Sequence, residues 1–313
     1  MLNYIKRRLL MLLPVLIGIS IVVFLVMHLA PGDPAEILAG PTASASDIAA
    51  LRAKLGLDDP VWVQYWRFVS GVLKGDLGTS VQSGESVTDM VKTRFPNTLA
   101  LSIAAMIVAS IVGLSTGVVS AVRKGSFFDS FSMIVALLGI SLPSFWVGLM
   151  LMLIFAVRLR WLPVAGYSGE WWTLVGIKQL VLPAVTLGIG ASALIARITR
   201  SSILEVMQQD YIRTARAKGL SQVATVGKHV LRNALVPVVT VMGLNFGGLL
   251  GGTVVTESVF AINGVGRMMV RAITSRDFPV VQGAVLMVAT TFVLINLLVD
   301  LTYALLDPRI RYD

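Results

Sequence analysis

Residues 209–220 read Gln-Asp-Tyr-Ile-Arg-Thr-Ala-Arg-Ala-Lys-Gly-Leu, and they begin the longest polar interruption in the apolar C-terminal half of the chain. Asp210 can cap a helix here because its carboxylate can accept hydrogen bonds from the free N–H groups of the first turn. Gly219 supplies the left-handed residue that ends this helix after about eight residues. A helix this short is not stable alone in water, so the sequence predicts that it docks against another surface.

A second short helix is predicted directly after the glycine turn. Ser221 can cap it through its hydroxyl group, and Val223, Val226 and Val230 would form one apolar stripe along it. Residues 206–237 are therefore expected to form a polar loop of two short helices between longer apolar segments.

The composition places the chain in a membrane. Apolar residues make up 56% of the 313 residues and charged residues 14%, and the mean hydropathy is +0.81, which excludes an ordinary soluble domain. A transmembrane helix needs about 20 apolar residues. Stretches of that length lie at 9–30, 98–122, 131–157, 180–204, 235–256 and 281–306. We therefore predict an all-α membrane protein with six transmembrane helices.

Several function classes are excluded by residue content. The net charge of +9 does not indicate nucleic-acid binding, because the basic residues cluster at the ends of apolar runs. The chain has no cysteine and only two histidines, His28 and His229, so no metal site is expected. Gly227-Lys228 lacks the glycine five positions earlier that a phosphate-binding loop requires. We therefore expect no cofactor and no enzyme activity in this chain.

The distribution of basic residues predicts the orientation in the membrane. With a cytoplasmic N-terminus, more than half of the 26 lysines and arginines fall in the short inside segments, as the positive-inside rule requires. Both termini and the loop 206–237 are then cytoplasmic. The outside segment 31–97 is predicted to hold two short helices at the membrane surface, with Trp62 and Trp66 at the level of the lipid headgroups.

The loop resembles that of a known family, the membrane-spanning permease subunits of ATP-binding-cassette importers. In that family a Glu-Ala-Ala motif, followed by a glycine and a Leu-Pro, forms the coupling helix that sits in a groove of the ATPase subunit. This chain has Thr214-Ala215-Arg216 in place of Glu-Ala-Ala and Val236-Pro237 in place of Leu-Pro. These departures are similar to the B-type permeases of dipeptide, oligopeptide, nickel and glutathione importers, which typically carry Asp-Tyr-Ile-Arg-Thr-Ala-Arg-Ala-Lys-Gly.

The resemblance covers nearly the whole chain. Further matching segments are Arg7-Arg8-Leu9, Pro31-Gly32-Asp33-Pro34, Gly75-Asp76-Leu77-Gly78, Asp277-Phe278-Pro279-Val280-Val281-Gln282-Gly283 and Asp307-Pro308-Arg309-Ile310. It implies a cytoplasmic tail and first span in 1–30, an extracytoplasmic segment in 31–97, and a five-span permease core in 98–313.

The resemblance also implies partners and a coupling site. The partners are a second homologous permease, two ATP-binding subunits that hold ATP and magnesium, and an extracytoplasmic substrate-binding protein, all at a bacterial inner membrane. Peptides are the expected cargo, with glutathione, nickel chelates and glycosides as alternatives. The residues expected to couple to the ATPase are Tyr211, Arg213, Thr214, Ala215, Arg216, Ala217, Lys218, Gly219, Leu220, Arg232 and Pro237.

The outside loop after the fifth span carries the expected solute or partner contacts. Residues 262–267 read Ile-Asn-Gly-Val-Gly-Arg where the family usually has Trp-Pro-Gly-Leu-Gly-Arg. Gly264 and Gly266 would allow a tight loop with exposed backbone groups, and Arg267 would offer its donors to a carboxylate of a docked partner or of a peptide. Glu257 would stand at the mouth and receive the amino end of a peptide. Alternatively, Arg267 and Glu257 pair with each other or with headgroups.

Polar residues within the spans leave further alternatives open. Pro143 should kink the third helix, with Ser141 able to satisfy a freed carbonyl, and Ser141 and Asn245 complete the expected solute path. Asp300 is expected to pair with a cytoplasmic-side arginine such as Arg197 or Arg200. A self-sufficient secondary transporter that uses Glu257 or Asp300 as its proton site is the alternative function. Its cytoplasmic loop would then need no ATPase.

Overall fold

The structure is a computed structural model that describes the backbone of residues 2–29, 33–40 and 43–306. The described residues are almost entirely helical, and their one β-bridge joins Thr79 and Ser86. The predicted all-α class is therefore confirmed. The side chains of Arg7, Arg8 and Asp300 lie outside the described residues, as do Pro31, Gly32 and the motif 307–310.

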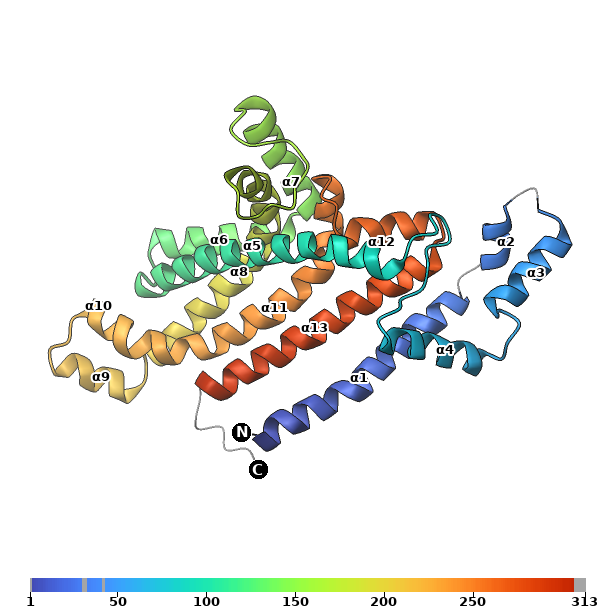
Figure 1. Cartoon of the computed structure of the whole chain (residues 1–313). Coiled ribbons are helices and arrows are strands. Elements are labelled where there is room, and N and C mark those ends of the chain that lie inside the picture. The colour runs from blue at the N-terminus through green and yellow to red at the C-terminus, as the bar shows by residue number, and fades with distance from the viewer. Residues whose placement is uncertain (1, 30–32, 41–42, 307–313) are drawn as a thin grey trace.

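Long helices form the body of the molecule, short ones lie at its two ends, and α7 projects from its middle (Figure 1). The helices in chain order are α1 (Leu2–Leu29), α2 (Pro34–Ala39), α3 (Ala45–Leu55), α4 (Val61–Leu73), α5 (Val87–Val122), α6 (Phe127–Ser141), α7 (Ser144–Leu151), the π-helix η1 (Met152–Arg158), α8 (Leu174–Val206), α9 (Asp210–Ala217), α10 (Gln222–Ala224), the π-helix η2 (Thr225–Val230), α11 (Leu231–Val259), α12 (Val265–Thr274) and α13 (Phe278–Leu306).

Four helical stretches of the described chain are long and apolar enough to cross a membrane. They are α5, α8, the continuous run from Gln222 to Val259, and α13. The bent pair of α6 with α7 and η1 adds a fifth if it is counted as one span, and α1 holds a shorter apolar stretch, Leu10–Leu25. The six-span count stays a prediction.

Close packing of α5 against α8 forms the centre of the bundle. A Cβ added at Gly113 would lie 2.8 Å from the side chain of Ile195, and one at Gly117 would lie 2.7 Å from the carbonyl oxygen of Ala196. Since real side chains do not approach so closely, the two glycines let the helix backbones come together. Ile195 is fully buried at this contact.

The glycines of α11 divide into two groups. A Cβ at Gly247 would lie 2.8 Å from the ring of Phe292, and Gly243 meets Val299 in the same way, so these two glycines pack α11 against α13. Gly248, Gly251 and Gly252 face open space. The small residues of the fifth span therefore serve packing at one face and leave the other face free.

The third span is broken rather than smoothly kinked. α6 and the α7–η1 segment meet at an angle of 106° around Pro143, which has no N–H for the helix ladder. The predicted kink at Pro143 is confirmed, and it is large enough to interrupt the helix. Ser141 donates through Oγ to the carbonyl of Leu137 at 2.9 Å. Pro183, by contrast, lies inside the continuous helix α8.

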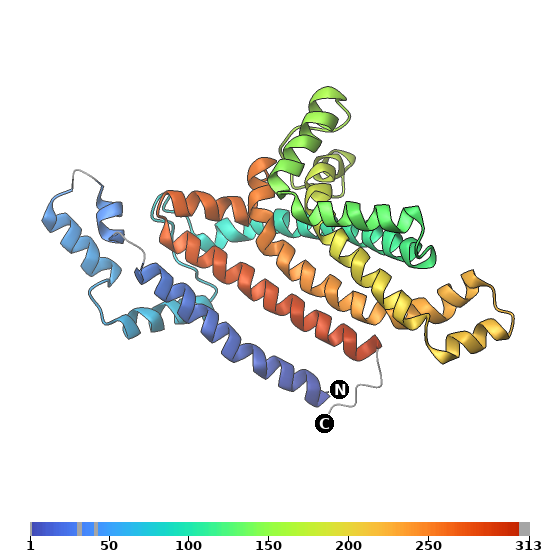
Figure 2. The same ribbon diagram turned by 180° about the vertical axis from the view of Figure 1, so that it is seen from behind.

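Short helices cover the end of the molecule opposite α9 and α10 (Figures 1 and 2). The two short helices predicted between 31 and 97 are α3 and α4, and α2 is an additional one. α4 packs on α1, where the Tyr65 hydroxyl lies 2.8 Å from Ser20 Oγ. Trp62 and Trp66 on α4 are 73% and 69% exposed, which leaves both indoles free for the membrane surface.

Two segments that carried the family resemblance, 75–78 and 277–283, lie together in space. The carboxylate of Asp277 is buried and accepts hydrogen bonds from the Ser80 hydroxyl and, at 3.1 Å, from the backbone N–H of Val81. A Cβ at Gly283 would lie 2.6 Å from Val87. The start of α13 therefore anchors the loop that leads into α5.

Candidate functional site

The first short helix of the loop forms where the sequence predicted it. α9 spans Asp210–Ala217, and Gly219 follows it with φ +84°, the left-handed conformation that ends a helix. The predicted cap was wrong by one residue. Gln209 precedes the helix in an extended conformation, and Asp210 is its exposed first residue, with Oδ1 3.5 Å from Nη1 of Arg213. The Asp210 carboxylate therefore faces a charged neighbour and solvent instead of the backbone N–H groups.

Part of the surface against which α9 docks belongs to this chain. Ile212 is fully buried and joins an apolar cluster with Ile203 of α8 and with Val230 and Ala234 at the start of the fifth span. Burying one isoleucine side chain contributes about 1.5–3 kcal/mol, which offsets the weak intrinsic stability of so short a helix. The buried Ile212 thus packs α9 between α8 and α11.

The second predicted helix is not a separate element. Ser221 caps it as expected, accepting from the backbone N–H of Ala224 at 3.3 Å, but α10 then continues through η2 into α11. Val226 and Val230 are buried, whereas Val223 is 84% exposed and does not belong to the predicted stripe. The π-helical turn, which holds more residues than an α-helical turn, shifts the buried face away from Val223.

The face of α9 that points away from the bundle is basic. Arg213, Arg216 and Lys218 are exposed, Ala217 between them is exposed as well, and Ala215 is half-buried. Asn233 of α11 donates to the Tyr211 hydroxyl at 2.8 Å, which ties the outer side of α9 to the long helix. Figure 1 shows α9 and α10 projecting beyond the ends of the long helices. The residues of α9 and its glycine turn that are predicted to couple to an ATPase therefore form a projecting, positively charged knob.

The opposite end of α11 carries a buried carboxylate. Glu257 is fully buried, and it accepts from Thr98 Oγ1 at 2.7 Å and from the backbone N–H of Arg267 at 2.8 Å. Thr98 in turn accepts from the N–H of Val265 at 2.9 Å. The carboxylate therefore caps the first turn of α12 from a different helix, where an anion is favoured by the free N–H groups.

This location corrects the position that the sequence predicted for Glu257 and the two glycines. Glu257 lies inside the protein and not at an exposed mouth, and its contact with Arg267 is to the backbone. Gly264 and Gly266 are buried too: a Cβ would lie 2.5 Å from Glu257 Oε2 at the first and 3.0 Å from it at the second. The glycines are required here because the carboxylate approaches the backbone, and not because the loop exposes its backbone groups.

The chain matches one family of membrane proteins along nearly its whole length. The family described as Binding-protein-dependent transport system inner membrane component matches residues 113–312, and the N-terminal part described for the same membrane component matches residues 1–102. The chain belongs to this family. It is a permease subunit of an ATP-driven importer and not itself an enzyme.

Individual relatives agree with this assignment along the whole chain. The glutathione transport system permease protein GsiC of Salmonella paratyphi A is 48% identical over 312 residues, and the dipeptide transport system permease protein DppB of Alkalihalophilus pseudofirmus is 47% identical over 333 residues; both matches cover all of each chain. A chain of the inward-facing MetNI methionine transporter has a TM-score of 0.59 at 19% identity, covering 70% of the permease and 96% of that chain, which shows a shared fold. The predicted B-type permease of a peptide or glutathione importer is confirmed.

An ion pair that the sequence did not predict joins α6 to α8. Asp129 of α6 accepts from Arg200 of α8 through Nε at 2.7 Å and through Nη2 at 2.8 Å. It also accepts from the Ser120 hydroxyl at 2.6 Å and from the N–H of Gly125 at 3.0 Å. Arg197 or Arg200 was expected to pair with Asp300. Arg200 pairs with Asp129 instead, and the side chain of Asp300 lies outside the described residues. The isolated acid in the apolar flank of the third span was the available signal.

The remaining predicted site residues make contacts within their own helices or lie on the surface, and no contact of theirs indicates a solute path. Asn245 donates to the carbonyl of Val241 on its own helix at 2.7 Å, and Ser141 makes the equivalent bond described above. Arg232 is exposed on α11, and Pro237 lies within that helix. The described residues contain no group of three or more His, Cys, Asp or Glu side chains that could hold a metal ion.

Proposed function

We propose that the permease carries dipeptides or oligopeptides across the bacterial inner membrane. Its near-half identity to both a dipeptide and a glutathione permease, each over the full chain, is the observation that supports this proposal. Glutathione is itself a small peptide, so the two relatives share one class of cargo. Nickel chelates and glycosides are the alternatives within the same importer type.

The coupling site in this proposal is the knob formed by α9 and its glycine turn. One ATP-binding subunit would hold α9 in a groove, while a second homologous permease would present an equivalent helix to a second ATPase. The exposed residues Arg213, Arg216 and Lys218 favour an acidic groove, and Ala217 between them permits close approach. ATP and magnesium would be bound by those subunits, and an extracytoplasmic binding protein would deliver the solute.

The arrangement of the chain ends supports the predicted orientation. Both views show the first turns of α1 and the last turns of α13 toward the end of the bundle that carries α9 and α10 (Figures 1 and 2). Since α9 must meet ATPases in the cytoplasm, both chain ends would then face the cytoplasm. α2, α3, α4 and α12 would lie on the outer side.

Reconstitution with the three partner types in liposomes tests the proposal. We expect ATP-dependent uptake of labelled dipeptides and tripeptides that persists when a protonophore collapses the proton gradient. Uptake that is abolished by the protonophore at constant ATP would instead support the secondary transporter. Uptake of a nickel chelate or a glycoside without any peptide uptake would contradict the peptide proposal but leave the importer class intact.

A further inference from the structure

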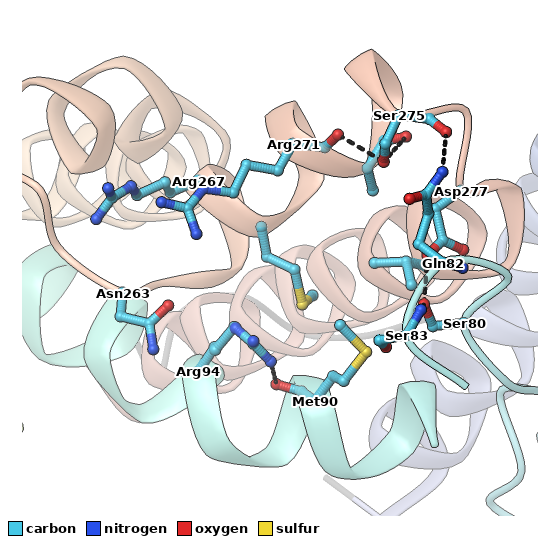
Figure 3. Close-up of a pocket in the computed structure, with 13 residues that line it drawn as sticks. Ser80, Gln82, Ser83, Met90, Arg94, Asn263, Arg267, Arg271, Ser275 and Asp277 are labelled. Carbon is cyan, nitrogen blue, oxygen red and sulfur yellow. Dashed lines mark hydrogen bonds between the residues drawn. The ribbon is translucent and has the colours of Figure 1, made fainter. Parts of the chain in front are cut away.

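A pocket of about 140 Å³ lies between the start of α5, the loop before it and α12 (Figure 3). Its walls carry three arginines: Arg94 from α5 and Arg267 and Arg271 from α12. Arg267 and Arg271 are four residues apart on one helix, so their side chains are neighbours on one face. Figure 3 shows Arg94 on α5, across the pocket from α12, with its guanidinium bonded to the carbonyl of Met90.

The charges of this pocket are not balanced within the described part of the chain. The one acidic residue in its wall, Asp277, is engaged by the Ser80 hydroxyl and by backbone N–H groups of the loop. Arg94 donates to the carbonyl of Met90 at 3.0 Å, and none of the described ion pairs involves Arg94, Arg267 or Arg271. Three guanidinium groups facing one small pocket repel one another unless an anion lies between them.

The arginines stand on a fixed frame. α12 is capped at its first turn by the buried Glu257, and its last turns lead directly to Asp277, which holds the loop on the opposite wall. Neither contact uses a side-chain donor of Arg267 or Arg271, so all of those donors remain for a ligand. Donors held in advance by surrounding structure bind an anion with a smaller loss of entropy than free side chains do.

The rest of the lining fits the end of a peptide. Asn263, Gln82 and Ser83 add amide and hydroxyl groups that suit a peptide bond, and Met90 and Met268 form an adaptable apolar wall. A space of about 140 Å³ admits a carboxylate with the few atoms next to it, and not a whole tripeptide. Arginine pairs with a planar carboxylate through two parallel hydrogen bonds, which matches this chemistry.

We propose that Arg94, Arg267 and Arg271 form a receiving site for the C-terminal carboxylate of the incoming peptide at the outer end of the permease. The inference rests on the proposed peptide function and adds to it the part of the substrate that the permease recognises, its C-terminal carboxylate. Every dipeptide, every oligopeptide and glutathione carries such a carboxylate, so the site would accept peptides of different sequence while excluding neutral solutes.

Paired peptides with a free and an amidated C-terminus test the site in reconstituted importer. Both peptides are first shown to saturate the binding protein, so that differences arise at the permease. We expect Arg271→Gln and Arg267→Gln each to lower uptake of the free-acid peptide about tenfold or more, the effect of losing one charge-assisted hydrogen bond, and to leave uptake of the amide unchanged. Arg158→Gln, which removes an exposed arginine outside the pocket, is the matched control and should change neither.

Each other outcome has a distinct meaning. The variants could lose uptake of both peptides equally and also bind the unloaded binding protein more weakly. That result would indicate that the arginines bind an acidic residue of the binding protein, and it would overturn the solute site. Unchanged uptake of both peptides in all arginine variants would also overturn it. If the unsubstituted importer takes up neither peptide, the proposed function fails first, and the inference falls with it. Membrane insertion and basal ATPase activity are measured for every variant to exclude misfolding.

Discussion

The ion pair between Asp129 and Arg200 predicts a large and specific loss of stability when one partner is removed. The Asp129 side chain is only 6% exposed, and its carboxylate accepts from Arg200, Ser120 and the Gly125 backbone. Breaking a buried pair leaves the other charge uncompensated, which costs about 3–5 kcal/mol. Because 26% of the Arg200 side chain is exposed and can regain water, we expect the lower end, about 3 kcal/mol, for Asp129→Asn.

Reversible unfolding of the purified permease in one defined lipid–detergent mixture measures this loss. Asp89→Asn, which removes an exposed acid from the first turn of α5, is the control and should cost less than about 0.5 kcal/mol. The double variant Asp129→Leu with Arg200→Met buries no charge, so it should be more stable than Asp129→Asn. Two results would refute the reasoning. One is an Asp129→Asn protein that is as stable as the Asp89→Asn control. The other is a double variant whose loss of stability equals the losses of Asp129→Leu and Arg200→Met added together.

Three further substitutions test the two ends of the permease. Ala217→Trp should prevent co-purification of the ATPase, because overpacking a close contact costs about 1–3 kcal/mol, and normal co-purification with normal uptake would contradict the docking of α9. Gly219→Val should uncouple ATP hydrolysis from uptake, because a side chain at φ +84° costs about 1–2 kcal/mol; unchanged stimulation of the ATPase by loaded binding protein would count against the turn. Gly264→Ala should lower thermal stability because its Cβ meets the Glu257 carboxylate, whereas Gly248→Ala, which faces open space, should not.

Features with a local cause could be predicted from the sequence. The length of α9 and the left-handed Gly219 follow from neighbouring residues, and both were predicted correctly. The break at Pro143 is of the same kind, because a missing N–H acts on its own helix. The cap was misplaced because Asp at the first helical position and Asp at the cap are both common, and one residue of backbone conformation decides between them.

Features that depend on distant segments could not be predicted in this way. Glu257 ends an apolar run, which suggests an exposed position, but the N–H groups that it caps belong to α12 and its other partner, Thr98, lies 159 residues earlier. The pairing of Asp129 with Arg200 likewise depends on which faces of α6 and α8 meet. In the arginine pocket, the sequence indicated Arg267 alone, because nothing local places Arg94 beside it.

The unbroken helix from Gln222 to Val259 has a mechanical consequence. At 1.5 Å per residue, a helix of 38 residues is about 57 Å long, and it joins the coupling knob at one end to the carboxylate that holds α12 at the other. Such a rod would act as a lever: a tilt of about 10° at the end that carries α9 would move the other end sideways by about 10 Å. In the proposed coupling, closure of the ATPases would displace the arginine pocket through this helix. The π-helical turn and Pro237 both lie near the end of the helix that carries α9, so a bend there would leave most of the length of the lever intact.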